Sequence, residues 1–145
     1  MTWMEHIEHF GGRICPENVA HHHCKEERAV LFQTFEGGGS EIETLWLLWA
    51  IARMVKPGLV LETGTFHGVG TVALANALKV NRGGKVVSVE LDAEKAGQAN
   101  NMVAQAGLAD YVEIVNQDSL EFIKALDTER FRFDLAFFDS LTSIS

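Results

Sequence analysis

One stretch of the sequence, residues 59–71, constrains the fold more than any other. It reads LVLETGTFHGVGT: a short apolar run, an acid, and then three glycines spaced through a small loop before a helical pattern begins. Glycine lets the backbone take positive φ angles and lets other atoms approach closely. A helix N-terminus offers N–H groups that its own carbonyls do not accept. A strand, a glycine loop and a helix in this order predict a nucleotide-binding site.

Strand-like and helix-like segments alternate regularly after residue 58. The first part of the chain differs: we expect a short helix at 26–35, a flexible EGGGS joint at 36–40, and an apolar helix at 41–55 capped by Ser40 with Glu43. Strands are predicted at 59–63, 85–91, 111–115 and 133–138, and helices at 69–80, 92–106 and 118–126. Short connections between alternating elements predict right-handed crossovers and a parallel sheet. The predicted fold is therefore α/β, a doubly wound parallel sheet over 40–145 preceded by a loop and helical segment at 1–39.

Composition and net charge limit the kinds of molecule that this chain is expected to bind. The 145 residues suffice for one domain, and 47% of them are hydrophobic. A net charge of −8 disfavours nucleic acid as the main partner, because phosphate is bound by Lys and Arg, and it favours a small molecule. No signal peptide is visible and no run approaches the roughly 18 apolar residues that span a bilayer. With only two cysteines, we expect a cytoplasmic protein with reduced thiols and no membrane partner.

Polar groups recur where the predicted strands end. They are Glu62 with Gly64, Glu90, Asp118 with Ser119, and Asp139. In a doubly wound sheet, ligands bind outside the carboxyl ends of the strands, where the strand order reverses. The repetition therefore predicts one ligand site built from all four strand ends.

Two common phosphate-binding motifs fit the glycine loop poorly. A dinucleotide fingerprint counted from Gly64 places Phe66 at its second glycine, and counted from Gly68 it begins too far beyond the strand. A P-loop requires a lysine that is not in place. The pattern at the strand end is E-x-G-x-x-x-G, which resembles the first motif of class I S-adenosylmethionine-dependent methyltransferases. It is most similar to the catechol and caffeoyl-CoA O-methyltransferase branch, over about residues 40–140.

This resemblance implies a Rossmann-like fold, S-adenosylmethionine as cofactor, and O-methyl transfer to a small-molecule acceptor. Enzymes of this class continue through further strands and helices, so the resemblance covers their cofactor-binding half and the C-terminal strands are missing. Other functions stay open: a non-catalytic S-adenosylmethionine-binding fragment, an interaction module, or an NAD-binding domain. The catalytic base is not identified. The apolar strand 133–138 would form an exposed edge, which predicts a homodimer or a partner chain that covers it.

The resemblance also assigns roles to the loop residues. Gly64, Thr65, Phe66 and Gly68 would approach the methionine part of the cofactor, with backbone N–H groups holding its carboxylate. Glu62 would hold the ammonium group, directly or through the loop. Gly70 stands where the family usually has a hydroxyl residue, and Thr71 would replace it one position late. The alternative is a tight turn that binds nothing.

The later strand ends complete the implied cofactor site. Glu90 would accept hydrogen bonds from the ribose hydroxyls, next to Leu91, unless it is a solvated acid. Asp118 and Ser119 would meet the adenine edge, and Asp118 also suits a helix N-cap. The acid that matches Asp139 binds a divalent cation in the resembling branch. The other ligands of that cation would lie beyond residue 145, so we expect no metal here and place Asp139 in the lining of the cofactor pocket.

Overall fold

The computed structural model describes residues 40–127, 129 and 131–140. The predicted segment 1–39, with its helix at 26–35, lies outside the described residues. The elements, in chain order, are α3 (Ile42–Val55), β1 (Leu59–Thr63), α4 (Val69–Asn81), β2 (Lys85–Glu90), α5 (Ala93–Gln105), η1 (Ala109–Tyr111), β3 (Val112–Asn116), α6 (Ser119–Lys124) and β4 (Leu135–Phe138).

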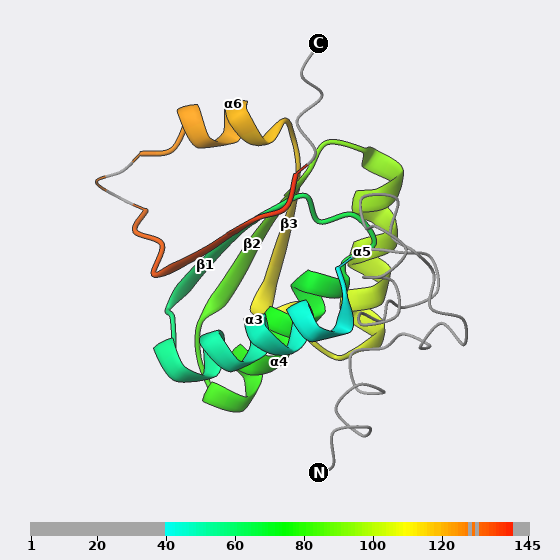
Figure 1. Ribbon diagram of the computed structural model, residues 1–145. Coiled ribbons are helices and arrows are strands. Elements are labelled where there is room, and N and C mark those ends of the chain that lie inside the picture. Colours follow the sequence, from blue (N-terminus) through cyan, green and yellow to red (C-terminus); the bar gives the residue numbers. More distant parts are fainter. Residues whose placement is uncertain (1–39, 128, 130, 141–145) are drawn as a thin grey trace, which may run out of the picture.

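The four strands form one parallel sheet in the order β3-β2-β1-β4. From β1 to β3 the chain moves across the sheet in one direction, and it then returns to place β4 on the other side of β1. Right-handed crossovers therefore put α4 and α5 on one face and α6 on the opposite face (Figure 1). The predicted α/β doubly wound parallel sheet is confirmed, and its strand order reverses between β1 and β4.

The hydrophobic core lies between the sheet and the helices α3, α4 and α5. Val60 and Val86 occupy aligned positions on β1 and β2, and both are fully buried. Leu45 of α3 and Leu74 of α4 are also fully buried in the same cluster. Because α4 is enclosed on nearly all sides, it holds the glycine loop before it in a fixed place relative to β1.

The capping of the helix at 41–55 and the start of the last strand differ from the sequence prediction, and β3 begins one residue later than predicted. Ser40 does not cap the helix at 41–55: the N-cap is Glu41, without a side-chain cap bond, and the Ser40 hydroxyl donates to Asp139 Oδ2 at 3.1 Å. The last strand begins at Leu135 instead of 133. Asp134 Oδ2 accepts the N–H groups of Gly58 (2.7 Å) and Leu59 (3.1 Å), so Asp134 fastens the start of β1.

The turn into β2 offers a test of the fold. Gly84 has a φ of +96°, and a Cβ there would lie 2.3 Å from the carbonyl oxygen of Pro57, whereas a Cβ on Gly83 would meet nothing within 4 Å. We expect Gly84→Ala to lower the free energy of unfolding by roughly 2 kcal/mol or more, from backbone strain and overlap. Gly83→Ala is the matched control and should change it by less than about 1 kcal/mol. Urea unfolding followed by circular dichroism measures both; equal losses would contradict this account.

Candidate cofactor site

The loop after β1 is shaped by two close backbone approaches. Gly64 has a φ of +82°, and a Cβ on it would lie 2.6 Å from the carbonyl oxygen of Asp139 at the end of β4. Gly68 has a φ of +88° and is the N-cap of α4, and its Cβ would lie 2.9 Å from the Cβ of Ala99 on α5. The loop therefore lies at the carboxyl end of β1, where the strand order reverses between β1 and β4, and this is where a doubly wound sheet binds its ligand.

A tight turn fills the space between these two glycines. The N–H of Gly68 donates to the carbonyl of Thr65 at 2.8 Å, and Phe66 within the turn has a φ of +50°. A positive φ is unusual for a residue with a side chain. The Phe66 ring lies 3.9 Å from the ring of His67 and 4.7 Å from the ammonium nitrogen of Lys95. These contacts give the turn one defined shape.

Glu90, at the end of β2, is the main polar contact of that turn. Its Oε2 accepts the N–H of Phe66 at 2.8 Å and its Oε1 accepts the N–H of Asp92 at 3.0 Å. Asn116 holds the backbone beside it, donating to the carbonyls of Glu90 (2.8 Å) and Leu91 (2.9 Å). The Glu90 side chain is partly exposed, and each carboxylate oxygen has two acceptor positions. The remaining acceptor positions suit the two hydroxyls of a ribose as donors, and this role of Glu90 stays a prediction.

Glu62 has a different environment from Glu90. It is 1% exposed, and its Oε2 accepts the hydroxyls of Thr71 (2.5 Å) and Ser88 (2.6 Å). Burial raises its pKa to about 7, the nearby Asp139 adds to this rise, and the two hydrogen bonds oppose it. The carboxyl is enclosed in this structure, and its direct contact with the ammonium group of a ligand stays a prediction. The indirect role, through the loop, stays a prediction.

The environment of Glu62 also explains Gly70 and Thr71. A Cβ on Gly70 would lie 2.6 Å from Glu62 Oε1, so a larger residue there would require the buried carboxyl to shift. The Thr71 hydroxyl points inward to the same carboxyl, and Thr71 is fully buried. Both Gly70 and Thr71 therefore face Glu62. The space that the Glu62 carboxyl needs gives a packing reason for glycine at position 70, where the family usually has a hydroxyl residue.

Ser88 is the residue of this region that the sequence prediction missed. It is fully buried in β2, and its hydroxyl lies 2.6 Å from both Glu62 Oε2 and Thr65 Oγ1. The sequence signal that could have identified Ser88 is that it is the one hydroxyl residue in the apolar strand VVSVE. Glu62 and Ser88 are aligned on adjacent parallel strands and point to the same face, so the buried acid and the hydroxyl meet.

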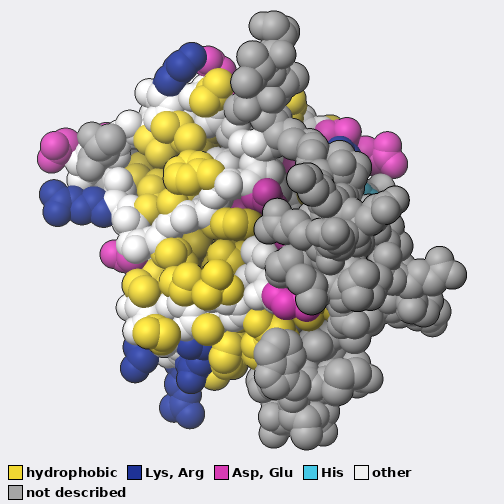
Figure 2. Space-filling view, viewed as in Figure 1, with side chains coloured by type: hydrophobic (Ala, Val, Ile, Leu, Met, Phe, Trp, Pro, Cys, Tyr) yellow, Lys and Arg dark blue, Asp and Glu magenta, His cyan; other side chains and the backbone are white. Residues whose placement is uncertain are grey.

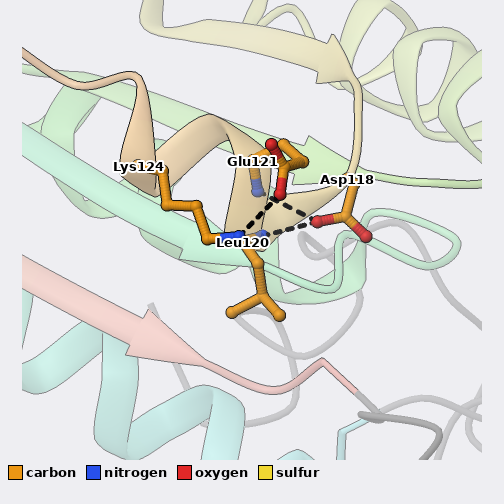
Figure 3. A network of polar contacts seen from close by, with 4 residues as sticks. All are labelled: Asp118, Leu120, Glu121 and Lys124. Carbon is orange, nitrogen blue, oxygen red and sulfur yellow. Dashed lines mark hydrogen bonds and ion pairs between the residues drawn. The ribbon is translucent and has the colours of Figure 1, made fainter.

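Asp118 is the N-cap of α6, which is one of the two roles that the sequence suggested for it, the other being contact with an adenine ring. Its Oδ1 accepts the N–H groups of Leu120 (2.8 Å) and Glu121 (3.0 Å), and Lys124 pairs with Glu121 at 2.7 Å (Figure 3). Asp118 and Ser119 follow β3 at the same edge of the sheet as Glu90. Their contact with an adenine ring stays a prediction.

Asp139 follows β4 and lies next to the glycine loop, where its carbonyl oxygen would be 2.6 Å from a Cβ on Gly64. Its N–H donates to the carbonyl of Thr63 at 3.0 Å, and its carboxylate accepts the hydroxyl of Ser40. The bond to Ser40 brings the start of α3 to the site. Among the described residues, no group of three or more His, Cys, Asp or Glu side chains is arranged to hold a metal ion.

Comparison with known proteins identifies the class to which this fold and loop belong. A methyltransferase domain family matches residues 61–145. Catechol O-methyltransferase B of Danio rerio is 32% identical over 96 residues, which is 64% of this chain and 35% of that protein. The O-methyltransferase TomG of Streptomyces achromogenes, solved with SAM, has a TM-score of 0.66 and 30% identity over 73% of this chain and 47% of its own. An O-methyltransferase of Bacillus cereus, solved with SAH, has a TM-score of 0.66 and 27% identity. The match covers 72% of this chain and 47% of that protein.

The chain belongs to this methyltransferase family, because the family match covers more than half of it. The resemblance to class I O-methyltransferases predicted from the glycine loop is confirmed. The chain spans less than half the length of these relatives. In the part of the chain that the structure describes, no helix is long and apolar enough to cross a membrane.

The raised pKa of Glu62 predicts a pH dependence of stability. The folded protein holds this proton up to about pH 7, against an ordinary value of 4.5, so the stability that the proton contributes is lost as pH rises between these values. Relative to Glu62→Gln, the wild-type free energy of unfolding should fall by about 2 to 3 kcal/mol from about pH 5 to pH 8. Urea denaturation at both pH values measures this difference. Parallel curves for the two proteins would contradict the assignment to Glu62.

Proposed function

We propose that this chain binds S-adenosylmethionine at the carboxyl edge of its sheet and acts in methyl transfer to an oxygen of a small molecule. The observation that carries the proposal is the Glu90 carboxylate, held by two backbone N–H groups beside the glycine turn. It is supported by the family match and by the related O-methyltransferase structures, which were solved with SAM and with SAH.

In this proposal the described residues bind and orient the cofactor. Glu90 accepts the ribose hydroxyls, the turn at 64–68 and the first turn of α4 face the methionine carboxylate, and Asp118 with Ser119 meets the adenine. Unlike α5 and α6, α4 has no side-chain cap and no acid in its first turn, which suits an anion at its N-terminus. The cofactor supplies an activated methyl group, so the protein chiefly supplies alignment.

The acceptor is proposed to be a small molecule. A net charge of −8 gives no field that would attract a phosphate backbone. A chain that binds the cofactor but transfers no methyl group would be the non-catalytic module that the sequence left open. A transfer assay with candidate hydroxyl acceptors separates these two functions.

Calorimetric titration tests the cofactor assignment. We expect S-adenosylmethionine and S-adenosylhomocysteine to bind, and Glu90→Ala to weaken binding by about 1–3 kcal/mol, or roughly 5- to 150-fold, through the loss of hydrogen bonds to a charged group. Glu113→Gln is the control, because Glu113 is an exposed acid on β3 that pairs with Lys85 at 3.5 Å. Circular dichroism checks that each variant is folded. Binding of NADH in place of these ligands, or an unchanged affinity in Glu90→Ala, would refute the assignment.

We also propose that a second copy of the chain covers β4. Within the described residues β4 pairs only with β1, and its sequence LAFF carries no charge that would repel another copy. Leu135 and Phe137 pack on the core, whereas Ala136 and Phe138 are exposed on the other face, and Phe138 is 64% exposed. Figure 2 shows hydrophobic side chains gathered on this side of the molecule. An unpaired apolar edge favours strand pairing between chains.

Light scattering of the purified chain tests this association. We expect a dimer for the wild type and a monomer for Ala136→Lys, since a lysine on an edge strand blocks pairing. Gln98→Lys carries the same charge change on an exposed position of α5 and should remain dimeric. A wild-type monomer at high concentration would refute the proposal.

A further inference from the structure

A chain of buried hydroxyl groups connects Glu62 to the glycine turn. The Ser88 hydroxyl lies 2.6 Å from Glu62 Oε2 and 2.6 Å from Thr65 Oγ1. Thr71 donates to the same oxygen of Glu62, and its hydroxyl is 3.4 Å from that of Ser88. The four residues are between 0% and 3% exposed. The cluster is therefore screened from water, where hydrogen bonds to a charge are strong.

The ionisation of Glu62 sets the direction of these hydrogen bonds. An ionised carboxylate only accepts, so Ser88 must give its single proton to Glu62, and Thr65 must then donate to Ser88. A protonated Glu62 donates one hydrogen bond of its own. When Ser88 accepts it, the Ser88 proton turns toward Thr65, which then becomes the acceptor. Ser88 thus transmits the ionisation state of Glu62 to Thr65.

Thr65 is the first residue of the turn that faces the proposed cofactor. Its carbonyl accepts the N–H of Gly68 at 2.8 Å, and the next residue, Phe66, donates its N–H to Glu90. A hydroxyl held firmly by a charge-assisted chain fixes this turn better than one held by neutral hydrogen bonds. The negative charge of Glu62 also favours the cationic amino group of the cofactor nearby.

We propose that Ser88 is a positioning residue that couples the ionisation of Glu62 to the Thr65 turn, so that cofactor affinity increases when Glu62 ionises. This inference rests on the proposed cofactor function. The pKa of Glu62, raised to about 7 by burial, places the transition near neutral pH.

The surroundings of Glu62 contain few competing charges. The neighbouring elements present Gly70 and Thr71 from α4, Ser88 from β2, and Phe137 from the aligned position of β4. Among the described residues, Asp139 is the charged group whose field acts on Glu62. His67 lies in the turn itself, with its ring 3.9 Å from that of Phe66, and is therefore the subject of a separate control.

The test is the affinity for S-adenosylhomocysteine measured by calorimetry from about pH 5.5 to pH 8.5. We expect wild-type binding to become about three- to tenfold tighter across this range, with a midpoint near the pKa of Glu62. Glu62→Gln and Ser88→Ala should lose the pH dependence, and Ser88→Thr, which keeps the hydroxyl, should restore it. Thr65→Val breaks the same connection from the loop side and serves if Ser88→Ala does not fold.

Two further variants separate this coupling from general disturbance of the site. Thr71→Val removes a hydrogen bond from Glu62 but leaves the connection to Thr65, so its pH dependence should persist with a higher midpoint. His67→Gln should keep the wild-type profile. A flat wild-type profile, a retained dependence in Ser88→Ala, or its loss in His67→Gln overturns this inference and leaves cofactor binding intact. No binding at any pH overturns the proposed function and this inference together.

Discussion

The enclosed carboxyl group of Glu62 is the constraint around which the centre of the molecule is arranged. It lies between β1, β2 and α4, where an uncompensated polar group would destabilise the fold. Thr71 and Ser88 each supply a hydroxyl from a different element, and Gly70 leaves the space that the carboxyl occupies. Packing and hydrogen bonding thus require a small residue and two hydroxyls at these positions before any ligand is considered.

Two acids hold the glycine turn from two sides, and they differ in exposure: Glu62 is buried and Glu90 is partly exposed. From the interior, Glu62 reaches it through Ser88 and Thr65, and from the surface, Glu90 accepts the N–H of Phe66. The interior acid is shielded and structural, whereas the surface acid keeps acceptor positions that a ligand can use. A loop fixed in this way loses little conformational freedom on binding, which is how preorganisation contributes to affinity.

The sequence predicted the strands, the helices and the parallel sheet because each depends on local periodicity and on short connections. It also predicted the cap Asp118, whose hydrogen bonds reach only two or three residues along the chain. Ser40 failed as a cap because its hydroxyl bonds Asp139, 99 residues away, and no local pattern shows such a partner. The burial of Glu62 likewise depends on how β2 and α4 enclose it.

The placement of β4 has a consequence for folding. Ser88 meets Glu62 across 26 residues, whereas Asp134 joins Leu59 only after 75 residues. Closing the longer loop costs more chain entropy, so we expect β1, α4 and β2 to assemble first and β4 to dock late. The contact between Gly64 and Asp139 is then among the last parts to form and the first to open in native-state hydrogen exchange. The proposed ligand site and the pair of strands expected to be least protected from exchange thus lie at the same place.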